Sequence, residues 1–373
     1  MNKDCSLPNN IFYDATFSVQ KYRGMGKYIN NFKLTLEEKF NLNCIGLLPG
    51  NIKNIDDKYY SFGFSLYFLW EQISLLIFRN RSNDLFIFPY NTAPIFLPRR
   101  KNNILILHDL IFMGDYKSKS LKQKFGNMYR KFILPIIIRK FNYIITVSEH
   151  SKKQIIEYFN IDENKISVIH NAINLKGYDF NNNIKSFEKA PFFLHIGGEP
   201  HYKNSLSVVY SFNLLPPEYK SKFKLFIIGI RESKVLNAYN DIVKSLNLSD
   251  KIFFLPYQTD EEIENLYKKA TLFIFPSKQE GFGIPVIESL KYGCPLLCSN
   301  TSCIPEIAQE AAFYFNPNSN NELAEGIIEI VSNPNLADER VKLGYSIVEK
   351  YSLENFKLKV SDWYVSNFIN SFK

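Results

Sequence analysis

Short apolar runs of strand length recur along the chain, each closed by turn or helix-start residues and separated by helical patterns. Runs of this length without polar alternation are typical of parallel strands that are buried on both faces. Their regular alternation with helices predicts doubly wound α/β sheets. We expect strands at 10–15, 43–49, 84–89, 102–109, 142–148 and 166–174 in the first half, and at 191–198, 223–229, 251–256, 270–277, 294–300 and 311–317 in the second.

The polar, irregular segment 176–191 interrupts this alternation and is typical of a linker. A chain of 373 residues is also too long for one ordinary core. We therefore predict two Rossmann-like domains, residues 1–180 and 181–349, which face each other across a cleft. Ligands in such sheets bind at the carboxyl ends of the strands, so the cleft is the expected site.

Residues 350–373 predict a C-terminal helix. Its aromatic side chains, Phe356, Trp363, Tyr364 and Phe368, recur at a spacing that gives an apolar stripe. Such a stripe must pack against another surface, and our hypothesis is that it packs back onto the first domain.

The net charge of +8 is concentrated in the first half, where residues 1–180 hold 25 Lys and Arg against 15 Asp and Glu. The densest part is 116–141, with eight basic residues mixed with Phe, Tyr, Leu and Ile. This composition suits an element that rests on an anionic membrane surface. It fits a solvated helix face equally well. Nucleic-acid binding is the least favoured reading, because no recognised module accompanies the basic stretch, and we expect no nucleic-acid partner.

Nothing in the sequence predicts secretion or a membrane span. The start, MNKDCSLPNN, lacks a basic region followed by an apolar run, so we expect no signal peptide. The apolar stretch 62–78 is interrupted by Glu71 and Gln72, which favours a buried amphipathic helix. The five cysteines are odd in number, and their spacing matches no usual zinc site. We expect buried thiols in a cytoplasmic protein, with peripheral contact at the inner face of the plasma membrane as a hypothesis.

The stretch SKQEGFGIPVIE, residues 277–288, places Glu280 in a tight loop and Glu288 inside the helix that follows. Gly281 and Gly283 let backbone N–H groups approach a ligand closely, and a helix start favours anionic oxygens. Carboxylates accept paired hydrogen bonds from the vicinal hydroxyls of sugars and riboses. The stretch therefore predicts a site for a phosphate between two polyols, with one acid for each polyol.

Three further turns are candidate site elements. In GGEPHYKNS, residues 197–205, a strand is followed by Gly197 and Lys203 and then a helix start, an arrangement that suits a diphosphate. In the first half, Gly24 and Gly26 form a Gly-x-Gly turn that opens a helix, which alone is a weak signal. His108 and Asp109 end a strand at its carboxyl end, where His108 is either catalytic or an ordinary structural histidine.

The run 257–317, with its E-x7-E spacing from Glu280 to Glu288, strongly resembles the retaining, nucleotide-sugar-dependent glycosyltransferases of family 4, which have the GT-B fold. Further pieces follow in the family's order, namely YDAT with GMGKYINNF, HDLIF, TVSEHSKKQII, KISVIHNAIN and the Lys203-Asn204 pair. The resemblance implies transfer of a hexose with retention to a glycan or lipid-linked acceptor, in the synthesis of a bacterial surface polysaccharide such as lipopolysaccharide O-antigen or capsule. GDP-mannose is the favoured donor; UDP-linked hexoses or N-acetylhexosamines and dTDP-rhamnose stay open.

The resemblance also implies roles for individual residues. Glu280 would contact the hydroxyls of the donor sugar, assisted by the N–H groups around Phe282 and Gly283, and Glu288 would bind the ribose. Lys203 would neutralise the diphosphate, and His108 would touch the donor sugar near the reacting carbon. The Gly24 to Gly26 turn would approach the phosphates and the acceptor, for which Asp109 is a predicted contact.

The family is usually metal-independent, because positive side chains and helix dipoles replace a cation, so we expect no metal and no cofactor apart from the nucleotide-sugar co-substrate. Many members carry an arginine a few residues before the lysine, where this chain has GGEPHY. Arg231, at the same strand edge, is our candidate substitute. The alternative to an enzyme is a non-catalytic GT-B subunit that scaffolds a polysaccharide assembly.

Overall fold

The computed structural model describes residues 10–19, 24–52, 57–80, 84–98, 102–114, 121–175 and 189–370. These residues form two compact units. The first comprises the described residues up to Gly114, Leu121–Ala172 and the chain from Leu353 onward, and the second is Ile173–Ser352. The sequence places the same divisions at residues 180 and 349. Most of the predicted linker and residues 116–120 of the basic stretch lie outside the described ranges.

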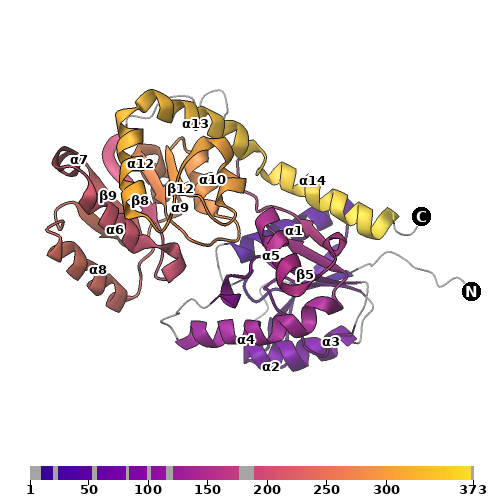
Figure 1. The fold of residues 1–373 in the computed structure, drawn as a ribbon. Coiled ribbons are helices and arrows are strands. Elements are labelled where there is room, and N and C mark those ends of the chain that lie inside the picture. Colours follow the sequence, from indigo (N-terminus) through magenta and orange to yellow (C-terminus); the bar gives the residue numbers. More distant parts are fainter. Residues whose placement is uncertain are drawn as a thin grey trace, which may run out of the picture. The chain divides into compact units, whose positions relative to one another are not determined.

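The first unit is built on a parallel sheet with the strand order β3-β2-β1-β4-β5-β6-β7 (Figure 1). The strands are β1 (Asn10–Asp14), β2 (Asn43–Pro49), β3 (Tyr59–Phe62), β4 (Leu85–Phe88), β5 (Asn103–Ile106), β6 (Tyr143–Thr146) and β7 (Ile166–Val168). The sequence prediction of six strands here was wrong by one, because it missed β3. This strand pairs with β2 at the edge of the sheet and has no buried residue, so it carries no apolar run.

The second unit has a parallel sheet in the order β10-β9-β8-β11-β12-β13. Its strands are β8 (Ala190–Ile196), β9 (Lys224–Ile228), β10 (Ile252–Leu255), β11 (Ala270–Phe275), β12 (Leu296–Ser299) and β13 (Ala312–Phe315). All six predicted strands are present. The two parallel sheets and their interleaved helices confirm the predicted α/β class.

Both sheets reverse their direction of growth at the centre. In the first sheet the chain runs from the central strand β1 outward to β2 and β3, and then returns to β4 on the other side of β1. In the second sheet it runs from β8 outward to β9 and β10, and then returns to β11 on the other side of β8. The loops that leave such neighbouring strands diverge to opposite faces of the sheet, which leaves a crevice at their carboxyl ends where ligands bind. The topology therefore marks the loops after β1 and β4 and those after β8 and β11.

Helices flank both sheets (Figure 1). In the first unit they are α1 (Met25–Phe40), α2 (Tyr67–Leu69), α3 (Leu76–Asn80), α4 (Leu121–Ile137), α5 (Glu149–Phe159) and α14 (Leu353–Tyr364), with a π-helix, η1 (Trp70–Leu75), between α2 and α3. In the second they are α6 (Ser205–Leu214), α7 (Pro217–Lys222), α8 (Ser233–Ser245), α9 (Asp260–Lys269), α10 (Ile284–Lys291), α11 (Ile304–Ala308), α12 (Asn320–Ser332) and α13 (Pro334–Glu349).

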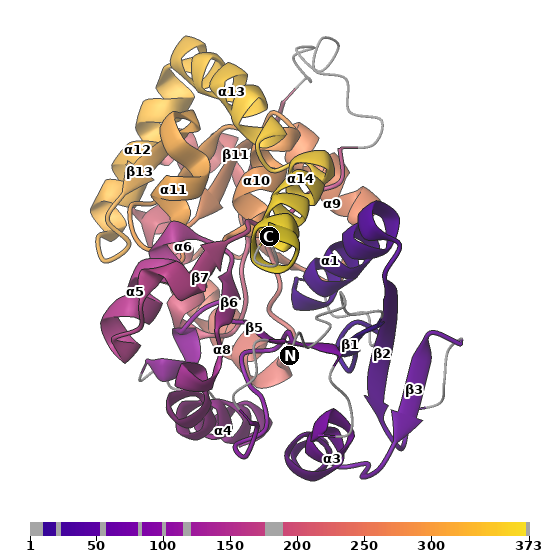
Figure 2. The same ribbon diagram turned by 90° about the vertical axis from the view of Figure 1, so that its right-hand side faces the viewer.

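The C-terminal helix α14 lies beside α1 in the first unit (Figure 2). The rings of Phe356 and Tyr28 are 5.3 Å apart, and those of Trp363 and Phe32 are 5.8 Å apart. The apolar stripe noted in the sequence thus covers α1, which also carries the Gly24 to Gly26 turn at its start.

The apolar stretch 62–78 forms α2, η1 and most of α3. Trp70 and Leu75 belong to the core, yet several large apolar side chains of this stretch point to solvent. The expectation of a buried helix therefore holds for one face only. In the described part of the chain, no helix combines the length and apolar character that crossing a membrane requires.

Candidate functional site

The loops after β8 and β11 are tied to each other by hydrogen bonds. The backbone N–H of Lys278 donates to the carbonyl oxygen of Tyr202 at 2.7 Å. The Asn204 side-chain amide donates to the carbonyl oxygens of Pro276, at 3.2 Å, and Pro317, at 2.8 Å. Asn204 has φ 55°, a left-handed conformation that asparagine tolerates better than most residues. One side chain thereby joins the loops after β8, β11 and β13.

Gly197 is required where it stands because a side chain has no room there. A Cβ atom on Gly197 would lie 2.2 Å from both Nε2 of His195 and Oγ of Ser205. His195 is fully buried and its Nδ1 lies 2.9 Å from the carbonyl oxygen of Ile274, so Nδ1 donates and Nε2 accepts from Ser205 at 2.9 Å. Burial lowers the pKa of His195 to about 4, which keeps this histidine neutral. No sequence pattern marks His195.

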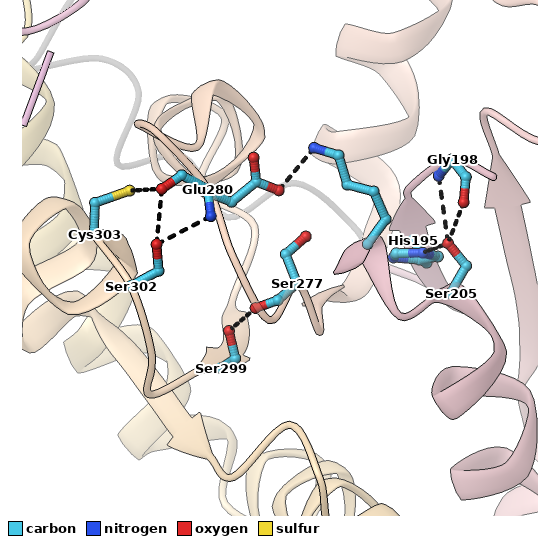
Figure 3. Close-up of polar contacts among 9 residues, drawn as sticks. His195, Gly198, Ser205, Ser277, Glu280, Ser299, Ser302 and Cys303 are labelled. Atoms are coloured by element: carbon cyan, nitrogen blue, oxygen red, sulfur yellow. Dashed lines mark hydrogen bonds and ion pairs between the residues drawn. The ribbon is translucent and has the colours of Figure 1, made fainter. Parts of the chain in front are cut away.

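Lys203 and Glu280 meet in an ion pair, with Nζ of Lys203 2.7 Å from Oε1 of Glu280. Lys203 ends a short 3-10 turn, His201–Lys203, after β8, and Glu280 lies in the loop after β11. Figure 3 shows how the Glu280 backbone is fixed from the other side. Its N–H donates to Oγ of Ser302 at 3.0 Å, and its carbonyl oxygen accepts from Ser302 at 2.7 Å and from Cys303 at 3.3 Å.

The rest of the loop leads into α10. Gly283 caps this helix with φ 90°, a conformation that glycine adopts without strain. The Phe282 side chain is buried, with its ring 5.5 Å from that of Tyr351. Phe282 therefore offers a ligand its backbone, not its ring. Glu288 lies on α10 and accepts a hydrogen bond at 3.3 Å from Tyr267, whose pKa burial raises well above its ordinary value.

Arg231 follows β9 and is exposed. Its guanidinium lies 5.7 Å from the ring centroid of Tyr257. Glu199, in the segment that departs from the family pattern, accepts from the backbone N–H groups of Arg231 at 2.5 Å and Glu232 at 3.0 Å. Partial burial opposes ionisation of Glu199, but these N–H groups outweigh it and lower its pKa. Glu199 thus fixes the two residues just ahead of α8, a role that no sequence pattern marks.

The other predicted site residues belong to the first unit. His108 is buried; its Nε2 lies 3.1 Å from the carbonyl oxygen of Pro89 and so carries the proton, and burial lowers its pKa to about 4. Oδ1 of Asp109 accepts from the N–H of Ile111 at 3.0 Å. Gly24 caps α1 with φ 90°, and a Cβ on Gly26 would lie 2.7 Å from the carbonyl oxygen of Phe17.

The second unit thus presents a cation beside a carboxylate at the point where its strand order reverses. A lysine ahead of a helix start binds anionic oxygens, and a carboxylate accepts from hydroxyls. This chemistry suits a ligand that carries phosphate and polyol groups side by side. Among the described residues there is no group of three or more His, Cys, Asp or Glu side chains that could hold a metal ion.

Two family models match the chain. The model of glycosyl transferases group 1 matches residues 179–347, and that of glycosyltransferase family 4 matches residues 55–176. The chain belongs to glycosyltransferase family 4. The family predicted from the E-x7-E stretch is confirmed, and the two parallel-sheet units of this glycosyltransferase have the GT-B fold.

The glycosyltransferase is similar to the O-antigen chain mannosyltransferase RfbU of Salmonella typhimurium, with 28% identity over 267 residues that cover 72% of this chain and 70% of the relative. O-antigen chain mannosyltransferase B of Escherichia coli is 28% identical over 221 residues, 57% of each chain. Among solved structures, Anabaena HepE in complex with UDP-glucose superposes with a TM-score of 0.69 at 14% identity, covering 96% of this chain and 99% of HepE.

Gly197→Ala should lower the free energy of unfolding by about 1–3 kcal/mol, because the new methyl group forces His195 and Ser205 apart. Gly198→Ala is the matched control, because the atom nearest to a Cβ added at Gly198 is Cδ of Pro200, at 3.3 Å, which leaves more room than at Gly197. Urea unfolding of the two variants measures the difference. Equal losses for both would show that the close packing around Gly197 is not a constraint.

Proposed function

We propose that this glycosyltransferase transfers mannose from GDP-mannose to a glycan or lipid-linked acceptor in the synthesis of lipopolysaccharide O-antigen. The contact between Lys203 and Glu280 at the reversal of the second sheet is the observation that carries the proposal. The donor sugar and the pathway are supported by the two mannosyltransferase relatives, which act on O-antigen chains. The use of a nucleotide sugar is supported by the fold shared with HepE, which binds UDP-glucose.

In the proposed complex the donor lies along the loops after β8 and β11. The Lys203 ammonium turns from Glu280 to the diphosphate, next to the N-terminus of α6, because a helix N-terminus favours anionic oxygens. The Glu280 carboxylate then accepts from hydroxyls of the sugar, with the backbone N–H groups of Gly281 to Gly283 nearby. Glu288 receives the ribose hydroxyls. Gly197, which lets His195 and Ser205 pack against its backbone, would place that backbone beside the donor.

We propose that the reaction retains the anomeric configuration and needs no metal. The bond between the anomeric carbon and the diphosphate oxygen breaks, the acceptor oxygen bonds to that carbon on the same face, and its proton passes to the departing diphosphate. Lys203 and the α6 N-terminus stabilise the charge that develops on the leaving group, which is usually the largest catalytic contribution. His108, with Nε2 held by Pro89, would contact the sugar, and the Gly24 to Gly26 turn and Asp109 would serve the acceptor side.

Glu280→Ala should lower kcat/KM for mannosyl transfer roughly 10- to 150-fold, the effect of losing hydrogen bonds to a charged group. Wild type and variant are compared with GDP-mannose, UDP-linked hexoses and N-acetylhexosamines, and dTDP-rhamnose. Glu218→Ala, an exposed glutamate of the same unit, is the control. A folded wild type that neither transfers nor hydrolyses any of these donors would favour the scaffold alternative.

Arg231→Ala tests whether Arg231 supplies the second charge for the diphosphate. The Glu199 side chain holds the backbone of Arg231 at the carboxyl end of β9, the neighbour of β8 in the sheet. Loss of a charge-assisted hydrogen bond should raise the Kd of GDP about tenfold. Lys234→Ala removes an exposed cation from α8, the helix that begins just after Arg231, and should leave the Kd unchanged. Equal Kd values in Arg231→Ala and wild type would exclude this role.

A peripheral contact with anionic lipid at the inner face of the plasma membrane is the second part of the proposal. Helices α2 and α4 lie side by side, since the ring of Phe68 is 5.4 Å from that of Tyr129 and the Gln72 side chain donates to the Tyr129 hydroxyl at 2.7 Å (Figure 1). Together with η1, α3 and the segment just before α2, they expose large apolar side chains that we call the apolar face, namely Phe64, Leu66, Phe68, Ile73, Ile77, Phe125, Met128, Phe132 and Ile136.

Large exposed apolar side chains gathered on neighbouring elements are typical of an interaction site. Exposed cations, Lys124 and Arg139, lie on α4 and on the turn that follows it. Apolar side chains with nearby cations are the combination that binds an anionic bilayer. This supports a role of the predicted 116–141 stretch in lipid contact and adds α2, η1 and α3 to it.

The double variant Phe125→Asp/Phe132→Asp should reduce binding to vesicles that contain phosphatidylglycerol by more than about 100-fold, because burial of each phenylalanine contributes roughly 1.5–3 kcal/mol. Co-sedimentation at low and high salt measures this, and the wild type should bind less at high salt. Tyr158→Asp changes an exposed aromatic residue on α5 and is the control. Binding that is insensitive to both salt and the double substitution would contradict lipid contact through this face.

A further inference from the structure

Two carboxyl groups that the proposed reaction does not use are buried at the reversal of the first sheet. Asp14 ends β1 and is 4% exposed, and Glu71, on η1, is 1% exposed. The hydroxyl of Tyr67, from α2, contacts both acids, and the hydroxyl of Thr92, from the loop after β4, contacts Glu71. Since β1 and β4 are the strands at which the order reverses, this cluster lies under the place where a ligand of the first unit is expected.

Glu71 is surrounded by hydrogen-bond donors. Its Oε2 accepts from the hydroxyl of Thr92 at 3.1 Å and from the side-chain amide of Gln72 at 2.9 Å, and the hydroxyl of Tyr129 also donates to it. Its Oε1 faces the hydroxyl of Tyr67 at 3.0 Å. Three donors on one oxygen suit a carboxylate that is ionised, because a protonated oxygen accepts fewer hydrogen bonds.

If both acids are ionised, the cluster has too few hydrogen atoms to form all of its hydrogen bonds. The Tyr67 hydroxyl lies 3.0 Å from Oε1 of Glu71 and also 3.0 Å from Oδ2 of Asp14. A phenol has one hydrogen, so it can donate to only one of these two oxygens. The other contact needs a hydrogen from a carboxyl group, and Asp14 can supply it. Oδ2–H of Asp14 then donates to Tyr67, and Tyr67 donates to Glu71.

The surroundings favour this protonation state. Burial raises the pKa of Asp14 to about 7, against the hydrogen bonds from Thr16, and burial also raises the pKa of Glu71. The titratable groups that face the pair are Tyr67, Tyr90 and Tyr129. Within the described residues, neither acid has an ion pair with a lysine, arginine or histidine that would hold both charges.

The Asp14 carboxyl group is also bonded to the loop that follows β1, so its protonation state affects that loop. Oδ1 of Asp14 accepts from the backbone N–H of Thr16 at 2.8 Å. The next residues turn back, with Ser18 donating from its N–H and its hydroxyl to the carbonyl oxygen of Ala15 at 3.0 and 2.8 Å. Gly26, at the start of α1, packs directly on the carbonyl oxygen of Phe17. Asp14 therefore fixes the turn that supports the Gly24 to Gly26 segment.

We propose that Asp14 is a positioning residue whose carboxyl group, while it keeps its proton, holds the loop after β1 in the form that binds the acceptor. This inference rests on the proposed mannosyl transfer. When Asp14 loses its proton, two carboxylates share the one hydrogen of Tyr67, and their repulsion disturbs the turn at Thr16. The acceptor KM should then rise with pH while kcat changes little.

Asp14→Asn tests this, because its amide donates to Tyr67 as the protonated acid does and its oxygen still accepts from Thr16. If only the protonated form binds, the wild-type acceptor KM rises about tenfold between about pH 6 and about pH 8. The Asp14→Asn KM should stay near the wild-type value at about pH 6 across this range. Asp57→Asn, an exposed aspartate of the same unit, should follow the wild-type profile. A variant KM that rises with pH as the wild type does would overturn the proposal.

The stability of the protein gives an independent readout. A folded state that holds its Asp14 proton more tightly than the unfolded chain loses stability as pH rises from about 4 to about 7, and Asp14→Asn lacks this loss. The advantage of Asp14→Asn over wild type in urea midpoint should therefore grow over this window and level off above it. Because the comparison is between the urea midpoints of Asp14→Asn and wild type, the contributions of His108 and His195 to the pH dependence cancel. Their lowered pKa values act in the opposite direction.

The same change at the other acid is the matched comparison. Glu71→Gln places an amide where three donors converge, so it should lower the urea midpoint at every pH. A constant stability deficit of Asp14→Asn at every pH would mean that Asp14 is ionised, and would overturn the proposal. If the wild type transfers no sugar, the proposed function fails, and the pH-dependent stability difference still decides whether Asp14 holds the proton.

Discussion

The reversal of strand order between β8 and β11 is the constraint on which the proposed donor site depends. It sends the two following helices to opposite faces of the sheet and leaves their loops adjacent at one edge. One backbone hydrogen bond and the Asn204 amide then fix these loops to each other, so Lys203 and Glu280 meet although they are 77 positions apart in the sequence. Without this topology neither residue would have a partner, and neither motif would carry chemistry.

The ion pair between Lys203 and Glu280 is suited to exchange. Lys203 is partly exposed whereas Glu280 is largely buried, so a phosphate can replace the carboxylate as the partner of Lys203 where sugar hydroxyls take the place of the ammonium at Glu280. The parts around it are fixed much more firmly. His195 is neutral and bonded at both ring nitrogens, Gly197 has no room for a side chain, and Ser302 and Cys303 hold the Glu280 backbone. A site that binds and releases a diphosphate needs charged side chains that can change partners and a backbone that stays in place.

Much of the fold and the centre of the site could be predicted from the sequence, because their signals are local. Buried strands show as apolar runs, and Glu280, Glu288 and Lys203 stand next to glycines and helix starts. The strand β3 was missed because four half-exposed residues at a sheet edge leave no such signal. His195 and Glu199 were missed because their partners, Ile274 and Arg231, are 79 and 32 residues away. The proton that we assign to Asp14 depends likewise on side chains from four separate segments, which no pattern in one segment reports.

The most direct test of the account is to titrate GDP and GDP-mannose into wild type and Glu280→Gln by calorimetry. If Glu280 holds the sugar and Lys203 the diphosphate, GDP should bind both proteins with the same Kd. GDP-mannose should lose about tenfold in affinity in the variant alone. An equal loss for both ligands, or no loss for either, would contradict the assignment of Glu280 to the sugar.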